Sequence, residues 1–283
     1  MRFVPMSELL TRAVAGGYAV PAFCAWNAEA MINVLSMASD LRAPVIIMNG
    51  PAEFGLISPP DFGAMAYALA AQFDVPAALH LDHGDSLVQV ETCLSSGYTS
   101  VMLDFSSRSY AENAGALRQV AAMARPRGVT VEGEIGHVGK VDAVSTEGAG
   151  ISTLTEPEEA ATYVAETGVN ALAISIGNAH GQYTRLPSLD FDRLAAIRKA
   201  VDIPLVLHGG SGTPESDLKR VISLGIAKVN VATELIAAVR ESLLEQWGKG
   251  ENEWTPVAQT MAMRAMAPIV EKWIRRTGAD GQA

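Results

Sequence analysis

The sequence predicts an α/β fold, a single (β/α)8 (TIM) barrel that spans residues 1–283 as one domain. Short apolar runs rich in Val, Ile, Leu and Ala recur along the chain, and amphipathic helical patterns lie between them. No low-complexity tract or Pro/Ser-rich linker divides the chain. A doubly wound dinucleotide-binding sheet is disfavoured because no GxGxxG motif follows the first apolar run. Eight strand–helix units in one undivided chain therefore favour the barrel.

The apolar runs predict the eight strands. Several are nearly continuous in aliphatic residues, as strands that are covered on both faces are. We expect strands at residues 18–23, 44–49, 75–82, 100–104, 130–135, 171–176, 204–208 and 228–232.

The segments between these strands carry helical periodicity, which predicts helices packed outside the barrel. The tail predicts a C-terminal extension of one or two further helices, at about residues 251–283. Between the strands we expect helices that include residues 28–41, 87–95, 110–124, 157–166 and 189–200.

Composition narrows the class of protein. The chain has 31 acidic and 21 basic residues, a net charge of −10, and is 49% hydrophobic and 18% charged. A chain of this kind buries a core, and it is poorly suited to bind nucleic acid or an anionic membrane. No apolar run approaches the roughly 20 residues that span a bilayer, and Ser7, Glu8 and Arg12 come too early for a signal peptide. We expect a cytoplasmic enzyme with no nucleic-acid or membrane partner.

Three of the five histidines fall where the barrel predicts an active site. Active sites in this fold lie at the carboxyl ends of the strands. His83 follows the third strand, His180 the sixth, and His208 ends the seventh. Three converging imidazoles suit one catalytic Zn²⁺ ion, which takes three protein ligands and leaves one position open.

The other two histidines are less easily assigned. His80 shares strand parity with Asp82, one layer deeper, which favours a residue that fills the core or supports the ligands. His137 lies in a long Gly-rich loop at residues 136–153, which predicts a lid. Its side chain either touches substrate or is solvated.

Two Gly-containing loops predict an anion site. HGGSG follows the seventh strand and NVATE joins the eighth strand to its helix, at the usual phosphate site of this fold. Glycines there expose backbone N–H groups, and a helix N-terminus adds positive potential. The predicted phosphate-binding residues are Gly181, Gly209, Gly210, Ser211, Asn230 and Thr233.

A metal ion, a phosphate site and carboxylates at the strand ends suggest Lewis-acid chemistry on a phosphorylated carbonyl compound. The competing mechanism is a lysine Schiff base. The sixth strand carries no lysine, and Lys228 lies two residues deeper than Asn230, about 6–7 Å along the strand. A Schiff base at the strand ends is therefore disfavoured.

Four segments together, VPAALHLDHG, AISIGNAHG, VLHGGSG and KVNVATE, resemble the class II, zinc-dependent ketose-bisphosphate aldolases of the fructose/tagatose-bisphosphate type. The resemblance runs from the first strand to about residue 244. It implies a (β/α)8 barrel that reversibly cleaves a ketose 1-phosphate or 1,6-bisphosphate to dihydroxyacetone phosphate and an aldehyde, through a metal-stabilised enediolate. A homodimer or homotetramer is expected.

The resemblance also implies roles for particular residues. Asp82 would move the proton of the hydroxyl that becomes the aldehyde, and a monovalent cation (Na⁺ or K⁺) would accompany the phosphate. Asp104 and Glu134 match family acids near an alternative metal position. The implied zinc ligands are His83, His180 and His208. The implied substrate-binding residues are Gly181, Gly209, Gly210, Ser211, Asn230, Val231, Ala232 and Thr233.

The chain departs from the family pattern in several places. Ala232 stands where fructose-bisphosphate members carry Asp, which favours the tagatose branch. Cys24 replaces an Asn and Gly50 a Ser or Thr, and Asp142 stands where the family has its proton-abstracting Glu. These changes lead to the hypothesis that the aldehyde partner differs from glyceraldehyde 3-phosphate, with Asp142 as the candidate catalytic base of the lid.

Two other functions stay open at this stage. A metal-dependent hydrolase on the same barrel would use the zinc to generate hydroxide, although such sites often take a His-x-His pair from the first strand, which this chain lacks. A non-catalytic sugar-phosphate-binding protein would keep the phosphate site and lose the base. A purely structural protein would leave the clustering of histidines unexplained.

Overall fold

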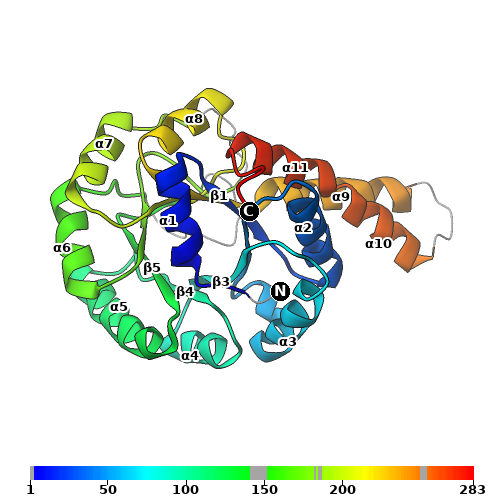
Figure 1. Cartoon of the computed structure of the whole chain (residues 1–283), viewed down its shortest axis with the longest axis horizontal. Helices are drawn as coiled ribbons and strands as arrows, with labels where there is room; N and C mark the ends of the chain where they lie inside the picture. Colours follow the sequence, from blue (N-terminus) through cyan, green and yellow to red (C-terminus); the bar gives the residue numbers. More distant parts are fainter. Residues whose placement is uncertain (1–2, 141–151, 182, 184–186, 249–253) are drawn as a thin grey trace.

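The computed structural model describes residues 3–140, 152–181, 183, 187–248 and 254–283, and it shows a closed barrel of eight parallel strands (Figure 1). Each strand pairs with the next, and β8 pairs with β1. The predicted (β/α)8 barrel is therefore confirmed. The strands are β1 Val20–Cys24, β2 Val45–Asn49, β3 Ala77–Gly84, β4 Ser100–Leu103, β5 Thr130–Ile135, β6 Ala171–Ile174, β7 Leu205–Leu207 and β8 Ile226–Val231.

Helices surround the barrel, and every residue of the eight strands is buried. Two short 3-10 helices lie at Glu53–Gly55 (η1) and Arg125–Arg127 (η2). The α-helices are α1 Met6–Gly16, α2 Ala28–Asp40, α3 Pro59–Ala70, α4 Leu87–Ser95, α5 Tyr110–Ala124, α6 Pro157–Thr167, α7 Phe191–Ala200, α8 Glu215–Ser223, α9 Thr233–Gly248, α10 Thr255–Arg264 and α11 Ala267–Arg276.

Local sequence signals explain where several helices begin and end. Ser109 and Glu112 form a capping box at the start of α5, and the Asn27 side chain accepts the backbone N–H of Ala30 at the start of α2. Gly17 and Gly168 adopt left-handed backbone angles directly after α1 and α6. Strand β5 and helices α4 and α5 have the predicted bounds.

Two strand ends differ from the prediction in a way that concerns the site. Strand β3 continues two residues further, so His83 lies within the strand rather than after it. Strand β6 stops at Ile174 because the chain then turns, and the Asn178 side chain accepts the backbone N–H of Ile176.

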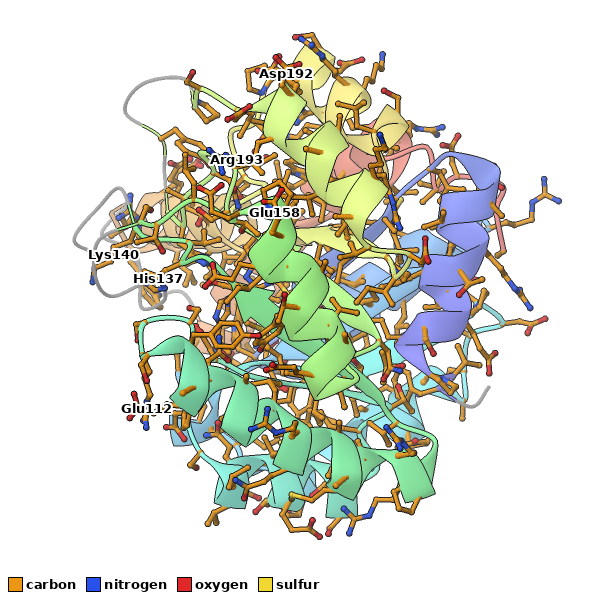
Figure 2. The ribbon with its side chains drawn as sticks, turned by 90° about the vertical axis from the view of Figure 1, so that its left-hand side faces the viewer. Glu112, His137, Lys140, Glu158, Asp192 and Arg193 are labelled. Carbon is orange, nitrogen blue, oxygen red and sulfur yellow. The ribbon has the colours of Figure 1, made fainter. Side chains whose placement is uncertain are left out.

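The two ends of the barrel are covered differently. Helix α1 lies across the amino-terminal end, where the Val4 backbone N–H donates to Ala77 O at the start of β3. At the opposite end the strands lead into the loops, and Figure 2 shows His137 and Lys140 on that side, away from α1. The carboxyl ends of the strands are therefore the open end that the sequence predicts for the site.

The C-terminal extension contains helices α10 and α11. Helix α11 packs against α2, and α10 packs against α9. Figure 1 shows α9 and α10 projecting beyond the ring of helices. Within the described part of the chain, no helix combines the length and the hydropathy needed to cross a membrane.

Candidate active site

Two adjacent residues of β3, Asp82 and His83, both contribute to the site. Neighbouring side chains of a regular strand point to opposite faces. Here His83 has a positive φ of 46°, and the register with β4 shifts between Leu81 and Gly84. Such an irregularity re-aims a side chain. It allows Asp82 to reach Asn230 while His83 reaches the other two histidines.

The three predicted histidines converge at the carboxyl ends of β3, β6 and β7. The ring centroid of His83 lies 4.9 Å from that of His180 and 4.6 Å from that of His208, and the last two are 5.6 Å apart. One ring nitrogen from each imidazole lies within 4.8 Å of the other two. All three residues are buried, with His208 fully so.

Two of these imidazoles are oriented by carboxylates. Nδ1 of His83 lies 2.8 Å from Asp104 Oδ2, and Nε2 of His208 lies 2.8 Å from Glu132 Oε1. Metal-binding histidines commonly donate their second ring N–H to a carboxylate in this way. The arrangement leaves Nε2 of His83 and Nδ1 of His208 as the nitrogens for a ligand.

The donor set fits a zinc ion. Buried Nδ1 of His208 makes no hydrogen bond, although Glu134 Oε2 is 3.3 Å away. Two nitrogens bound to a tetrahedral zinc at about 2.1 Å lie roughly 3.4 Å apart, which a small rotation of these rings reaches from within 4.8 Å. Three neutral imidazoles are also a ligand set found in catalytic zinc sites.

Carboxylates make this cluster attractive to a cation. Burial favours the neutral form of His208, but the hydrogen bond to Glu132 and the nearby carboxylate of Glu134 outweigh it and raise the pKa of His208 to about 9. Burial raises the pKa of Asp104, but the hydrogen bond and charge of His83 hold that pKa well below its usual range. Asp104, Glu134 and His83 also form a second group with ligand atoms within 4.8 Å of one another, where the resemblance places an alternative metal position.

Asp82 is buried beside the histidines. Its two oxygens lie 3.0 and 3.2 Å from Nδ2 of Asn230, which donates to them. Burial raises the pKa of Asp82, but the nearby His83, His80 and Lys228 outweigh burial and hold that pKa well below its usual range. Asp82 is therefore an ionised carboxylate, able to accept a proton.

A second charged layer lies beneath the first. His80, Glu132 and Lys228 are completely buried. Nζ of Lys228 donates to Glu132 Oε2 at 2.8 Å and lies 3.3 Å from His80 Nε2. His80 and Lys228 are thus both buried beneath the site residues of their strands, as expected for a His80 that fills the core or supports the ligands.

The loops after β6, β7 and β8 are tightly packed where the sequence predicts phosphate binding. Gly209 has a φ of 63°, and a Cβ there would lie 2.0 Å from Ala179 O. A Cβ on Gly210 would meet Val229 Cγ1 at 2.4 Å, and the Gly210 N–H donates to Asn230 O. Only glycine therefore fits at either position.

The start of α9 holds the loop after β7. The backbone N–H of Glu234 donates to Ser211 Oγ, and its carboxylate accepts the Gly212 N–H at 2.9 Å. Thr233 is the first residue of α9, Val231 is the last residue of β8, and Ala232 lies between them. The predicted residues of the two loops thus lie next to each other. The backbone N–H groups at the N-terminus of α9 lie beside them.

His137 belongs to the same hydrogen-bonded system. Its Nδ1 lies 2.8 Å from Ser106 Oγ, which donates to Asp104 Oδ1. Its backbone pairs with Thr153 through hydrogen bonds of 2.8 and 3.0 Å. His137 is only 4% exposed, so the interpretation of it as a solvated histidine is wrong. Asp142, the candidate base, lies outside the described residues.

Sequence reasoning missed several supporting residues. The Tyr183 hydroxyl donates to Gly209 O and accepts the Ala179 N–H, so it joins the β6 and β7 loops. Asn178 donates to the backbone oxygen of His208. The Arg193 guanidinium donates to Thr155 O where the long loop returns to α6 (Figure 2). Of these, only Asn178 lies in a segment that the sequence analysis singled out, AISIGNAHG.

Comparisons with known proteins agree with this geometry. The family model for class II fructose-bisphosphate aldolase matches residues 4–282. The YdjI aldolase of Escherichia coli K12 has a similar structure, with 32% identity over 99% of both chains and a TM-score of 0.87. A putative fructose-1,6-bisphosphate aldolase of Coccidioides immitis is 30% identical over 97% of this chain and 96% of its own, also with a TM-score of 0.87.

A more distant structure shares the fold. The fructose-bisphosphate aldolase of Campylobacter jejuni is 22% identical over 100% of this chain and 97% of its own, with a TM-score of 0.83. The family match spans the whole barrel and includes all the clustered side chains described above. The chain therefore belongs to the class II fructose-bisphosphate aldolase family, and it is an enzyme of the aldolase type.

Proposed function

We propose that this aldolase is zinc-dependent and reversibly cleaves a ketose 1-phosphate or 1,6-bisphosphate to dihydroxyacetone phosphate and an aldehyde. The observation that carries the proposal is the convergence of His83, His180 and His208 beside the ionised Asp82. The family match supports aldolase chemistry, and the donor set supports zinc as the metal. His83, His180 and His208 would hold the ion.

The bound zinc would supply Lewis acidity, which polarises the ketose carbonyl and stabilises the negative charge of the enediolate. Asp82 takes the proton from the C4 hydroxyl as the C3–C4 bond breaks, and this hydroxyl oxygen becomes the aldehyde oxygen. Asn230 donates to both Asp82 oxygens, so it holds the carboxylate in place. In the reverse direction the same carboxyl group returns the proton.

The electron pair of the broken bond remains on the dihydroxyacetone phosphate half. A proton must then be added at C3 of the original ketose, and removed there in the condensation direction. We propose Asp142 for this step, on the basis of the family resemblance. The side chain of Asp is one methylene shorter than the family's Glu, which motivates the proposal of an aldehyde partner other than glyceraldehyde 3-phosphate.

The phosphate of the dihydroxyacetone half would lie at the loops after β6, β7 and β8. The positive φ of Gly209, the packed Gly210 and the N-terminus of α9 support this placement. A Na⁺ or K⁺ ion would offset the carboxylates near this phosphate. The remaining proposed contacts come from Gly181, Ser211, Asn230, Val231, Ala232 and Thr233.

A substrate panel tests this function. Purified zinc-replete enzyme is given fructose and tagatose 1,6-bisphosphates and several ketose 1-phosphates with other tails, and dihydroxyacetone phosphate is followed by a coupled assay. We expect release that EDTA abolishes, with the highest kcat/KM for a ketose 1-phosphate other than these two bisphosphates. High activity on fructose or tagatose 1,6-bisphosphate with little on the other ketoses would contradict the altered aldehyde partner, because both bisphosphates yield glyceraldehyde 3-phosphate.

The same panel separates the competing functions. No release from any member, combined with tight binding of dihydroxyacetone phosphate, would indicate a sugar-phosphate-binding protein. Release of inorganic phosphate without an aldehyde would indicate a hydrolase. Either result would overturn the proposed aldolase reaction.

A further inference from the structure

The deeper layer of the barrel contains charged groups that the proposed reaction does not use. His80, Glu132 and Lys228 each lie two residues before a residue of the candidate site, on β3, β5 and β8. All three are completely buried. The interior of such a barrel is filled mainly by branched aliphatic side chains, so three polar residues in one layer require a physical reason.

Stability alone is a poor reason for this layer. Moving a carboxylate and an ammonium group out of water costs several kcal/mol each, and buried ion pairs are often no better for stability than apolar residues of similar size. The hydrogen bonds of the layer are nevertheless well formed: Lys228 Nζ is 2.8 Å from Glu132 Oε2, and His80 Nδ1 is 2.8 Å from Ser100 Oγ.

The contacts lead from Lys228 to the candidate metal site. Glu132 uses one oxygen for Lys228 and the other for Nε2 of His208, each at 2.8 Å. Lys228 holds Oε2 of Glu132, so the position of Oε1 is fixed as well. Oε1 then fixes the plane of the His208 ring and keeps the ring proton on Nε2. The other nitrogen, Nδ1, is then the one left for a metal ion.

Lys228 also lies where a second cation would be expected. His80, Asp82 and Glu132 have ligand atoms within 4.8 Å of one another, which is an arrangement suited to a positive ion. The ammonium group of Lys228 lies 3.3 Å from His80 Nε2 and 2.8 Å from Glu132. The side chain of Lys228 thus supplies a positive charge that offsets one of the two carboxylates of this cluster.

We propose that Lys228 is a positioning residue for the metal site. It acts as a built-in cation that fixes Glu132, and Glu132 in turn orients His208 for the metal ion. This inference rests on the proposed function, since it requires that His208 be a metal ligand. It assigns Lys228 a role different from Schiff-base formation, which its burial and its two partners prevent.

The test measures zinc affinity rather than turnover. Lys228→Met keeps the length and apolar stem of the side chain and removes its charge. We expect Lys228→Met to bind zinc about 10–100-fold more weakly than the wild type, as loss of a supporting contact to a metal ligand does. Affinity is measured by competition with a chromophoric chelator. Lys219→Met is the matched control, because Lys219 is exposed and pairs with Glu215 at the surface.

A second variant separates positioning from a general loss of structure. If Lys228 acts through Glu132, the double variant Lys228→Met/Glu132→Gln binds zinc within about threefold of Glu132→Gln alone. The double variant also removes the unpaired buried carboxylate, so it gives a result even if Lys228→Met fails to fold. In this variant both members of the Lys228–Glu132 ion pair are replaced by uncharged side chains.

Two results would overturn the proposal. One is unchanged zinc affinity in folded Lys228→Met. The other is a double variant that binds zinc tenfold or more weakly than Glu132→Gln, which would show that Lys228 acts independently of Glu132. A wild-type protein that binds no zinc would instead contradict the proposed function, so the two failures are distinguishable.

Discussion

Asp82 is the side chain on which the proposed proton transfer depends. It is buried, it is ionised, and Asn230 holds both of its oxygens. Its neighbour His83 reaches the same site only because the backbone of β3 departs from regular alternation, with φ at 46°. Asp82 and His83 are therefore adjacent residues of β3 that both contribute side chains to the same site.

Replacing Asp82 by Asn removes the proton acceptor while it keeps the shape of the side chain. We expect Asp82→Asn to lose about 10²–10⁴-fold in kcat for retro-aldol cleavage, with zinc content unchanged. Asp74→Asn is the control, because Asp74 is exposed in the segment before β3. Activity within threefold of the wild type in Asp82→Asn would contradict the role of this carboxylate.

For the individual residues of the site, the sequence predicted which side chains come together. It did not predict the backbone geometry that brings all of them there. Strand parity correctly placed His80 beneath Asp82 and Lys228 beneath Asn230. The sequence placed His83 just after the third strand, whereas it lies within β3, and no sequence signal indicated the register shift between Leu81 and Gly84. Such a shift depends on the packing of β3 against β4, which a single strand's sequence does not encode.

The loop after β7 and the start of α9 form one structural element of the site. Gly209 packs against Ala179 O, while Glu234 holds Ser211 and Gly212. Glu234 is itself bound by Lys272 and Trp273 of α11. The C-terminal extension thus supports the predicted phosphate loop, a connection that separate motifs do not reveal because its partners are far apart in the sequence.

Gly209→Ala tests the need for close packing in this loop. A Cβ would lie 2.0 Å from Ala179 O in a backbone conformation that favours glycine. We expect a destabilisation of roughly 1–3 kcal/mol and a raised KM for the phosphorylated ketose, from thermal unfolding and steady-state kinetics. Gly115→Ala in α5 is the control, because no atom lies closer than 3.8 Å to its added Cβ. A Gly209→Ala enzyme with wild-type Tm and KM would contradict this packing argument.

Glu234 gives this element a pH dependence. Burial raises the pKa of Glu234, but hydrogen bonds from Lys272, Gly212 and Trp273 outweigh it and hold the pKa below its ordinary value of 4.5. A carboxylate with a lowered pKa contributes stability above pH 4.5 and loses it as the pH falls through the folded-state pKa. We expect the Tm difference between wild type and Glu234→Gln to be largest near neutral pH and to narrow below pH 4.5. A difference that is constant with pH would argue against the ionised Glu234.

On the scale of the whole molecule, exposed apolar side chains gather at one edge of the barrel. Helices α9 and α10 project there (Figure 1). A groove of about 390 Å³ lies between η1 and α9 and is lined by Trp26, Leu56 and Trp247, among others. The exposed large apolar residues of this edge are Leu56, Ile236, Leu244, Trp247, Trp254, Val257 and Met261.

The same surface carries a projecting apolar helix and an apolar groove, which suits a self-complementary contact with a second copy of the chain. We expect light scattering to give a homodimer or homotetramer of the 29.8 kDa chain, and Leu244→Glu to shift it towards the monomer. Val88→Glu is the control, since Val88 is also an exposed apolar residue but lies on α4. A wild-type monomer at micromolar concentration would contradict this expectation.

The barrel itself was predictable because strand and helix patterns alternate along the entire chain, and local caps agree with them. The clustering of histidines was predictable for the same reason, since the fold brings all strand ends together. The hydrogen bonds of Tyr183, Ser106 and Glu132 were not, because they depend on the distances between loops and layers that only the closed barrel sets.

Reversible removal of the metal tests most directly whether this enzyme is a zinc aldolase. The enzyme is stripped with a chelator, then titrated with zinc while bound metal and dihydroxyacetone phosphate release are both measured. We predict that activity is lost on stripping and returns in proportion to bound zinc, reaching its maximum at about one ion per chain. His180→Ala should bind zinc at least tenfold more weakly. Full activity in the stripped protein, or zinc binding that is unchanged in His180→Ala, would contradict the zinc-dependent reaction at these three histidines.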